Sequence, residues 1–133
     1  MATILLIEDD SAVRDVTAQI LRHASHVVDE ASDGRAGLTR YGAAKHDLII
    51  TDIVMPDMDG IELITKLRNT TPRPRIIAIS GGSRFSQLVY LPTAKQLGAQ
   101  RTLAKPIHPE ALLRAVAEVL AGPVPVTTSL PAT

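Results

Sequence analysis

Two hydrophobic patterns alternate along the chain. Short continuous apolar runs are typical of strands that are buried on both faces of a parallel sheet. Longer stretches in which apolar residues recur at a spacing of three or four are typical of helices that pack one face on a core. The runs that predict strands are Thr3–Ile7, Val27–Val28, Leu48–Asp52, Arg75–Ser80 and Arg101–Ala104.

A helix is predicted after each of these runs. Ser11 is expected to cap a helix over residues 12–23 and Gly122 to end the last one, which Pro109 opens. The others are predicted over Gly34–Ala44, Gly60–Asn69 and Pro92–Leu97. The residues expected to face the core are Val13, Val16, Ile20 and Leu21 in the first helix and Ile61, Ile64 and Leu67 in the third, with Leu63 at the edge of that stripe.

The segment between Ser80 and Arg101 has the least clear pattern. Pro92 lies inside it, and proline disrupts a helix interior but is tolerated in the first turn. We therefore expect a short or irregular helix there, which forms an unusual face for a partner. Residues 123–133 are rich in proline and threonine without a period, which predicts a disordered tail after one domain over residues 1–122.

Five alternating strands and helices predict an α/β fold in which helices cover both faces of a parallel sheet. Right-handed crossovers bring the carboxyl ends of all the strands to one edge, where open sheets of this class place their ligands. Polar residues end four of the five strands: the pair Glu8-Asp9, then Asp52, Ser80 and Lys105. Each alone has an ordinary explanation, since Asp52 could start a turn or cap a helix, but their convergence predicts a functional site.

Composition and charge exclude several classes of function. The 133 residues fit one domain, and 14 basic residues balance 14 acidic ones, which argues against direct binding of nucleic acid. The absence of cysteine excludes disulfides and thiolate metal sites, and the four histidines show no metal-ligand spacing. No apolar run has the length of a membrane span, and the start of the chain lacks the pattern of a signal peptide. We expect a cytoplasmic protein.

The residues expected at this edge of the sheet are suited to binding a metal ion and a phosphoryl group. Three acids held close together repel one another unless a proton or a cation compensates them. A few oxygen ligands with room for water and phosphate suit Mg²⁺. The Asp52 carboxylate could then attack phosphorus as a nucleophile, while Lys105 and the Ser80 hydroxyl bind phosphoryl oxygens.

Over about residues 3–121 the sequence resembles the receiver domains of two-component response regulators, the CheY-like family. The resemblance rests on motifs in the family's order: Ile7-Glu8-Asp9-Asp10 with Arg14, Asp52 with Met55-Pro56-Asp57-Met58-Asp59-Gly60, Ser80-Gly81 and Lys105-Pro106. It implies a doubly wound, flavodoxin-like sheet with the strand order 2-1-3-4-5 and a cis peptide bond before Pro106.

The resemblance also implies roles for individual residues. Asp52 would accept the phosphoryl group from a phosphohistidine on a sensor histidine kinase or a histidine phosphotransfer protein. Asp9 and Asp52 would bind Mg²⁺ directly, Glu8 through water and Val54 through its backbone carbonyl. Asp10 is expected to point away. The phosphorylated domain would bind a downstream protein target or pass the phosphoryl group on in a relay, so the chain would not be an enzyme with a separate substrate.

One position departs from the family, and two other functions compete. The aromatic residue that usually lies three positions before the lysine is replaced by Thr102, so signalling would rely on backbone shifts after Ser80 and Lys105. The chain could instead be a degenerate receiver that binds partners without phosphorylation. A phosphatase with an aspartyl-phosphate intermediate would need an acid two residues after Asp52, where Val54 lies. We expect no DNA-binding module in the short stretch after the last helix, and the sequence could also be the receiver part of a longer chain.

Overall fold

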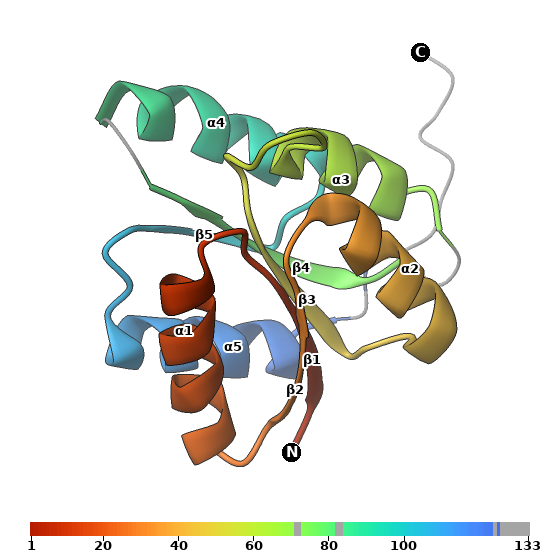
Figure 1. Cartoon of the computed structure of the whole chain (residues 1–133), viewed down its shortest axis with the longest axis vertical. Helices are drawn as coiled ribbons and strands as arrows, with labels where there is room; N and C mark the ends of the chain where they lie inside the picture. Colours follow the sequence, from red (N-terminus) through yellow and green to blue (C-terminus); the bar gives the residue numbers. More distant parts are fainter. Residues whose placement is uncertain (71–72, 82–83, 124, 126–133) are drawn as a thin grey trace.

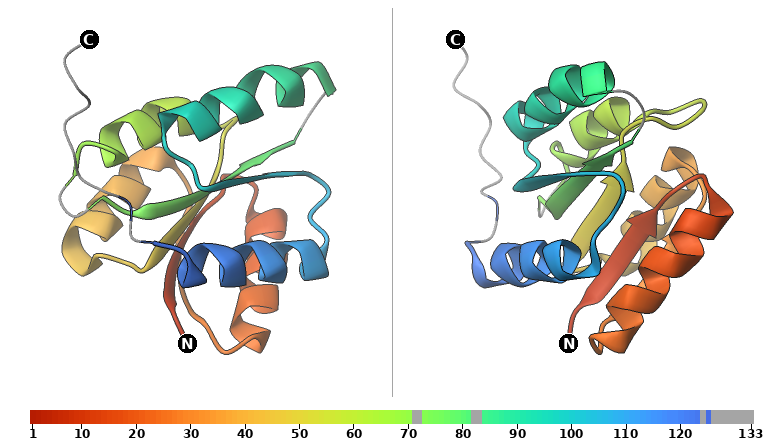
Figure 2. Two further views of the ribbon diagram at one scale, coloured as in Figure 1. Left: turned by 180° about the vertical axis from the view of Figure 1, so that it is seen from behind. Right: turned by 90° about the vertical axis from the view of Figure 1, so that its left-hand side faces the viewer.

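The computed structural model describes residues 1–70, 73–81, 84–123 and 125, with the backbone alone for residues 84–87. Five parallel strands form one sheet in the order β2-β1-β3-β4-β5, which confirms the predicted fold class and strand order. Helices α1 and α5 cover one face, and α2, α3 and α4 cover the other (Figures 1 and 2). The bounds are β1 Thr3–Ile7, α1 Ser11–His23, β2 Val27–Ala31, α2 Gly34–Ala44, β3 Leu48–Asp52, α3 Gly60–Leu67, β4 Arg75–Ser80, α4 Arg84–Leu97, β5 Arg101–Ala104 and α5 Pro109–Ala121.

The core has two layers, one on each face of the sheet. Side chains of successive strand residues point to opposite faces, so Ile49 packs under α2, α3 and α4 while Leu48 and Ile50 pack under α1 and α5. All five residues of β3 are buried. Burial of each such aliphatic side chain contributes about 1.5–3 kcal/mol, which fixes the central strand and therefore the position of Asp52 at its end.

Strand β2 is longer than predicted. It runs on from Val28 through Asp29 and Glu30 to Ala31. The two acids are tolerated because they form ion pairs at this edge of the sheet, Asp29 with Arg40 and Glu30 with Arg14 and Arg22, and because Asp29 is also hydrogen-bonded to His46. An apolar pattern alone does not detect such a strand.

Helix α1 begins one residue earlier than predicted. Ser11 is its first residue, and Asp10 is the N-cap, whose Oδ1 accepts from the backbone N–H groups of Ala12 and Val13 at 2.9 and 3.1 Å. The expected inward stripe is also partly wrong. Thr17, Ala18 and Leu21 are the buried residues of α1, while Val16 is 58% exposed. Ala18 and Leu21 are the α1 residues in the core cluster, and Val16 lies outside the face that they define.

Helix α3 differs in a similar way. It ends at Leu67 rather than Asn69, and Leu63, Ile64 and Leu67 form its buried face. Leu63, expected at the edge of the stripe, is fully buried, whereas Ile61 is only partly buried. Burial of adjacent Leu63 and Ile64 centres the stripe one residue later than the sequence pattern indicated.

Helix α4 contradicts the expected short or irregular helix. It spans Arg84–Leu97, 14 residues, with Pro92 inside it. Proline removes one intrahelical hydrogen bond and crowds the preceding turn. Pro92 is exposed, however, and Leu91, Ala94 and Leu97 pack on the core. Their burial offsets the cost of the proline and keeps the helix continuous.

The predicted tail, residues 123–133, lies almost wholly outside the described residues. Within the described part of the chain, no helix has both the length and the apolar character needed to cross a membrane.

Candidate functional site

Three carboxyl groups meet where β1 and β3 end. Glu8 and Asp9 follow β1, and Asp52 ends the neighbouring strand β3. One oxygen of each lies within 4.8 Å of an oxygen of the other two. Glu8 and Asp52 are 4% and 5% exposed, whereas Asp9 is exposed. The structure therefore brings together the three acids that the sequence placed at this edge, two of them withdrawn from solvent.

Lys105 reaches the same cluster from the end of β5. Its Nζ donates to Asp52 Oδ2 at 3.0 Å and lies 2.7 Å from Glu8 Oε1. Burial lowers the pKa of Lys105, but its hydrogen bonds and charge interactions with Glu8 and Asp52 outweigh that effect, so the pKa is raised overall. The side chain is therefore a cation at neutral pH and compensates part of the charge of the two buried carboxylates. The peptide bond between Lys105 and Pro106 is cis, as the family resemblance implied.

A cavity of about 300 Å³ opens over the acidic cluster. Asp52 Oδ1 is buried at this site and has no hydrogen-bond partner among the described residues. A buried carboxylate oxygen normally has a partner, so this atom is available to a ligand. Three carboxylates with one oxygen unengaged are the hard donors that Mg²⁺ prefers, and the cavity leaves room for water. The residues present thus fit a small divalent cation.

Ser80 and Val54 occupy different positions relative to this cavity. Val54 lines it and is 53% exposed. Ser80 ends β4 and is fully buried; its Oγ donates to the backbone carbonyl of Gly81 at 3.3 Å, and Gly81 rather than Ser80 lines the cavity. The roles of the Ser80 hydroxyl and of the Val54 carbonyl remain predictions.

The sequence did not indicate how Glu8 is held. Glu8 pairs directly with Lys105, and the backbone carbonyl of Glu8 accepts from Arg14 Nη1 at 2.8 Å. Asp10, the third acid of the run, caps α1, which agrees with the expectation that it points away, although it also lines the rim of the cavity. The tertiary structure adds the contacts of each acid: Glu8 pairs with Lys105, and Asp10 caps α1.

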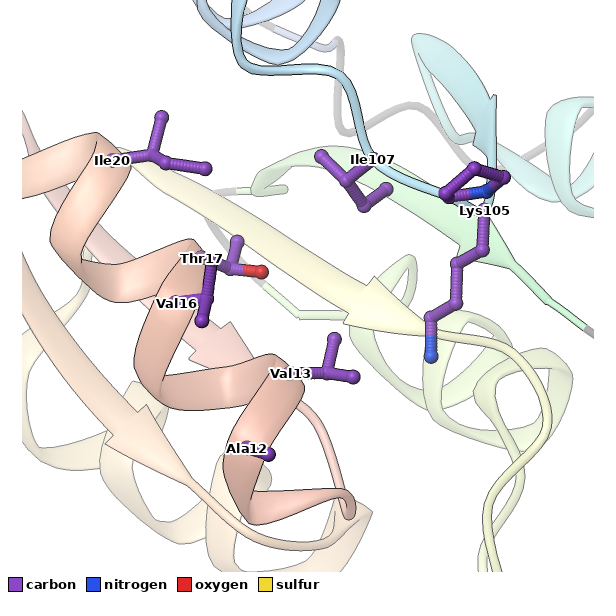
Figure 3. A pocket seen from close by; sticks show the side chains of 8 residues that line it. Ala12, Val13, Val16, Thr17, Ile20, Lys105 and Ile107 are labelled. Carbon is purple, nitrogen blue, oxygen red and sulfur yellow. The ribbon is translucent and has the colours of Figure 1, made fainter.

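An apolar groove of about 330 Å³ adjoins the acidic cluster and was not predicted. Figure 3 shows the side chains of α1 on one side of it and Ile107 on the other, with Lys105 at its end. The α1 residues are Ala12, Val13, Val16, Thr17 and Ile20. The sequence pattern placed Val13 and Val16 in the core, and for this reason it did not predict an exposed apolar surface beside the site.

Asp9→Asn should weaken Mg²⁺ binding by about tenfold or more, since it removes one of three carboxylate ligands. Although Asp9 is exposed, the loss of part of its hydration, together with a hydrogen bond and charge repulsion from Glu8, raises its pKa. A raised pKa means that ionisation of Asp9 disfavours the folded state once pH rises above that pKa. The variant should therefore also be slightly more stable than the parent in EDTA at neutral pH.

Calorimetric Mg²⁺ titration and urea unfolding in EDTA measure the two effects. Asp15→Asn is the matched control, because Asp15 is an exposed acid on α1 away from the cluster. Unchanged Mg²⁺ affinity in Asp9→Asn would exclude Asp9 as a direct ligand.

Comparisons with known proteins identify the family to which the chain belongs. The model of the response regulator receiver domain matches residues 4–117. The chain is 32% identical over 120 residues to the response regulator receiver protein CpdR of Brucella abortus, covering 90% of this chain and 98% of that protein. It is 36% identical over 131 residues to the nitrate/nitrite response regulator protein NarL of Escherichia coli, covering 97% of this chain and 59% of that protein.

Solved structures give the same result. A response regulator receiver domain protein from Clostridium thermocellum superposes with a TM-score of 0.84 at 26% identity, covering 90% of this chain and 94% of that one. The chemotaxis response regulator CheY4 of Vibrio cholerae gives 0.79 at 30% identity, covering 90% and 98%. The chain spans 59% of NarL and 53% of ArlR of Staphylococcus epidermidis, so it corresponds to part of such regulators. By this family match and its five-stranded architecture, the chain belongs to the response regulator receiver domains, the CheY-like domains of two-component systems.

Proposed function

We propose that Asp52 accepts a phosphoryl group from a phosphohistidine on a sensor histidine kinase or a histidine phosphotransfer protein, in the presence of Mg²⁺. The phosphorylated form then binds a downstream protein target or passes the group on. The observation that carries the proposal is the state of the Asp52 carboxylate: Oδ2 is paired with Lys105, while Oδ1 is buried without a partner among the described residues. The proposal includes a cytoplasmic location and no direct contact with nucleic acid or membrane.

The chemical step needs a nucleophile and compensation of charge. A carboxylate oxygen of Asp52 forms the new P–O bond as the P–N bond of the donor breaks, and the imidazole nitrogen leaves with the electron pair. Lys105, already 3.0 Å from Asp52, is close enough to turn its ammonium to a phosphoryl oxygen. The Ser80 hydroxyl would bind another oxygen by exchanging its present contact with the Gly81 carbonyl for one with the phosphoryl group.

Glu8, Asp9 and Asp52 would hold the metal ion, with the Val54 carbonyl as a further ligand. Bound Mg²⁺ would neutralise the negative charge that gathers on the phosphoryl oxygens. Without the metal ion, the Lys105 ammonium compensates part of the negative charge of Glu8 and Asp52, because it contacts both buried carboxylates.

An α4 surface is the proposed face for a downstream partner. Leu88, Val89 and Tyr90 are 69%, 46% and 39% exposed on this helix. Adjacent exposed apolar residues are typical of protein contact sites. With Thr102 in place of an aromatic side chain, we propose that phosphorylation reaches this face through the loops that follow Ser80 and Lys105.

Incubation with acetyl phosphate and Mg²⁺ tests the proposed function. Intact-mass measurement should show one added phosphoryl group, stable in acid, labile in alkali and absent when EDTA replaces Mg²⁺. Continuous hydrolysis of varied phosphate esters would instead indicate a phosphatase, which Val54 makes unfavourable because it cannot transfer protons. Failure to form the adduct with acetyl phosphate or with a phosphohistidine protein would favour the degenerate receiver and refute the proposal.

A further inference from the structure

A second charged cavity lies near the amino ends of β3 and β4, away from the acidic cluster. Its volume is about 170 Å³, and it is lined by Lys45, His46, Asp47, Arg73 and Arg75, together with Tyr41 and two prolines. Most of these residues come from the end of α2 and from the segments that lead into the two strands, and Pro125 follows α5. No residue lines both this basic cavity and the acidic one, so the two are separate features of the described structure.

The basic cavity carries an excess of positive charge. Lys45, Arg73 and Arg75 contribute three cations, and Asp47 supplies one carboxylate among the described lining residues. Asp47 Oδ2 is already engaged, because it accepts from the backbone N–H of Thr3 at 2.8 Å. Burial, together with repulsion from Arg68, lowers the pKa of Arg73. Arg73 Nη2 donates to the backbone carbonyl of Leu97 at 3.2 Å, so Lys45 and Arg75 are the basic residues that we assign to a ligand in this cavity.

Two buried nitrogen atoms of the lining have no hydrogen-bond partner among the described residues. Arg75 donates through Nη2 to the carbonyl of Gly122 at 3.0 Å, but its Nε–H is unengaged. The His46 side chain is 1% exposed; its Nε2 lies 3.0 Å from Asp29 Oδ2, and its Nδ1 is the unengaged atom. Buried polar atoms without partners are uncommon, and the unengaged Nε–H of Arg75 belongs to a residue that lines this cavity, so a ligand that accepts hydrogen bonds could satisfy it.

We propose that this basic cavity binds a small oxyanion of the phosphate type. Guanidinium groups present planar sets of N–H donors that match phosphate oxygens, and an ammonium adds a compact charge. The Nε–H of Arg75 would gain its missing acceptor, and the Lys45 ammonium would add a second charged donor. The volume lies below the roughly 300 Å³ of sites for larger organic ligands, so a free oxyanion fits better than a nucleotide.

Titration of the intact ¹⁵N-labelled protein with inorganic phosphate tests this site. The buffer contains EDTA and is kept at pH 7 and constant ionic strength, which removes metal effects and general screening. Amide resonances of residues 45–47 and 73–75 should shift and saturate. Arg75→Gln should weaken phosphate binding by about tenfold or more, because a hydrogen bond to a charged group is lost.

Two further variants keep the result interpretable. Lys45→Asn alters an exposed residue whose φ of 51° asparagine tolerates, so the fold should persist while affinity falls several-fold. Arg101→Gln is the matched control, since Arg101 starts the neighbouring strand β5, is exposed and does not line the cavity; it should bind like the parent.

Shifts that do not saturate, or that map only to the acidic cluster, would overturn the proposal. Equal affinity in Arg75→Gln and Arg101→Gln would overturn it as well. Asp52→Asn should bind phosphate at the basic cavity like the parent, so the outcome is independent of the proposed phosphoacceptor function.

Discussion

Asp52→Asn should abolish formation of the alkali-labile phosphoryl adduct with acetyl phosphate and Mg²⁺. An uncharged carboxamide is a poor nucleophile, and it also removes one of the three carboxylates at the proposed metal site. The residue is 5% exposed at the end of a fully buried strand, so its side chain is held in place and a neighbouring acid cannot take its position. Intact-mass measurement over a time course gives the yield in parent and variant.

Asp57→Asn is the matched control for this experiment. Asp57 is an exposed acid in the loop after β3, and its φ of 65° is one that asparagine also adopts. The change in charge and shape is the same as in Asp52→Asn, yet the adduct should form at the parent's yield. A full yield of adduct in Asp52→Asn would mean that a residue other than Asp52 accepts the phosphoryl group.

Gly60→Ala should destabilise the protein by about 3 kcal/mol and slow the phosphorylation of Asp52. A Cβ at this position would lie 2.5 Å from both the carbonyl oxygen of Asp52 and the Cα of Ile53. Both are backbone atoms at the end of β3, so they cannot turn aside as a flexible side chain would. The Gly60 N–H also donates to the Ile53 carbonyl at 2.6 Å, so relief of the clash would displace the segment that carries Asp52.

Gly42→Ala provides the comparison. Gly42 lies on the exposed side of α2, and a Cβ there would meet no atom within 4 Å. Alanine in a helix is favoured over glycine by about 1 kcal/mol, so this variant should be more stable than the parent. Urea unfolding at pH 7 measures both variants. Equal stability of Gly60→Ala and the parent would mean that the loop after β3 relaxes freely, and that Gly60 does not position the acceptor.

The sequence predicted the strands well where burial on both faces produces a continuous apolar run, as in Leu48–Asp52 and Arg75–Ser80. It predicted β2 poorly because ion pairs from other segments neutralise Asp29 and Glu30. Such pairs depend on which helices pack beside the strand, and local composition does not contain that information.

Helix faces were harder to predict for a related reason. An apolar residue is compatible with the core, but only packing decides which of several apolar residues enters it. Val16 is exposed in the groove beside Lys105, while Ala18 and Leu21 of the same helix pack into the core. Helix α4 continues through Pro92 because its other face packs on the core. The helix propensities of its residues do not reveal this packing.

The chain by itself determined the α/β fold, the order of its elements and the set of acids expected at one edge, because strand periodicity and right-handed crossovers act on local patterns. The tertiary structure decided the partners: Lys105 bridges Glu8 and Asp52, and Asp52 Oδ1 is left unengaged. It also gathered Lys45, Arg73 and Arg75 around a buried histidine. Charges separated by tens of residues interact only after folding fixes their distances, and no spacing along the chain encodes those distances.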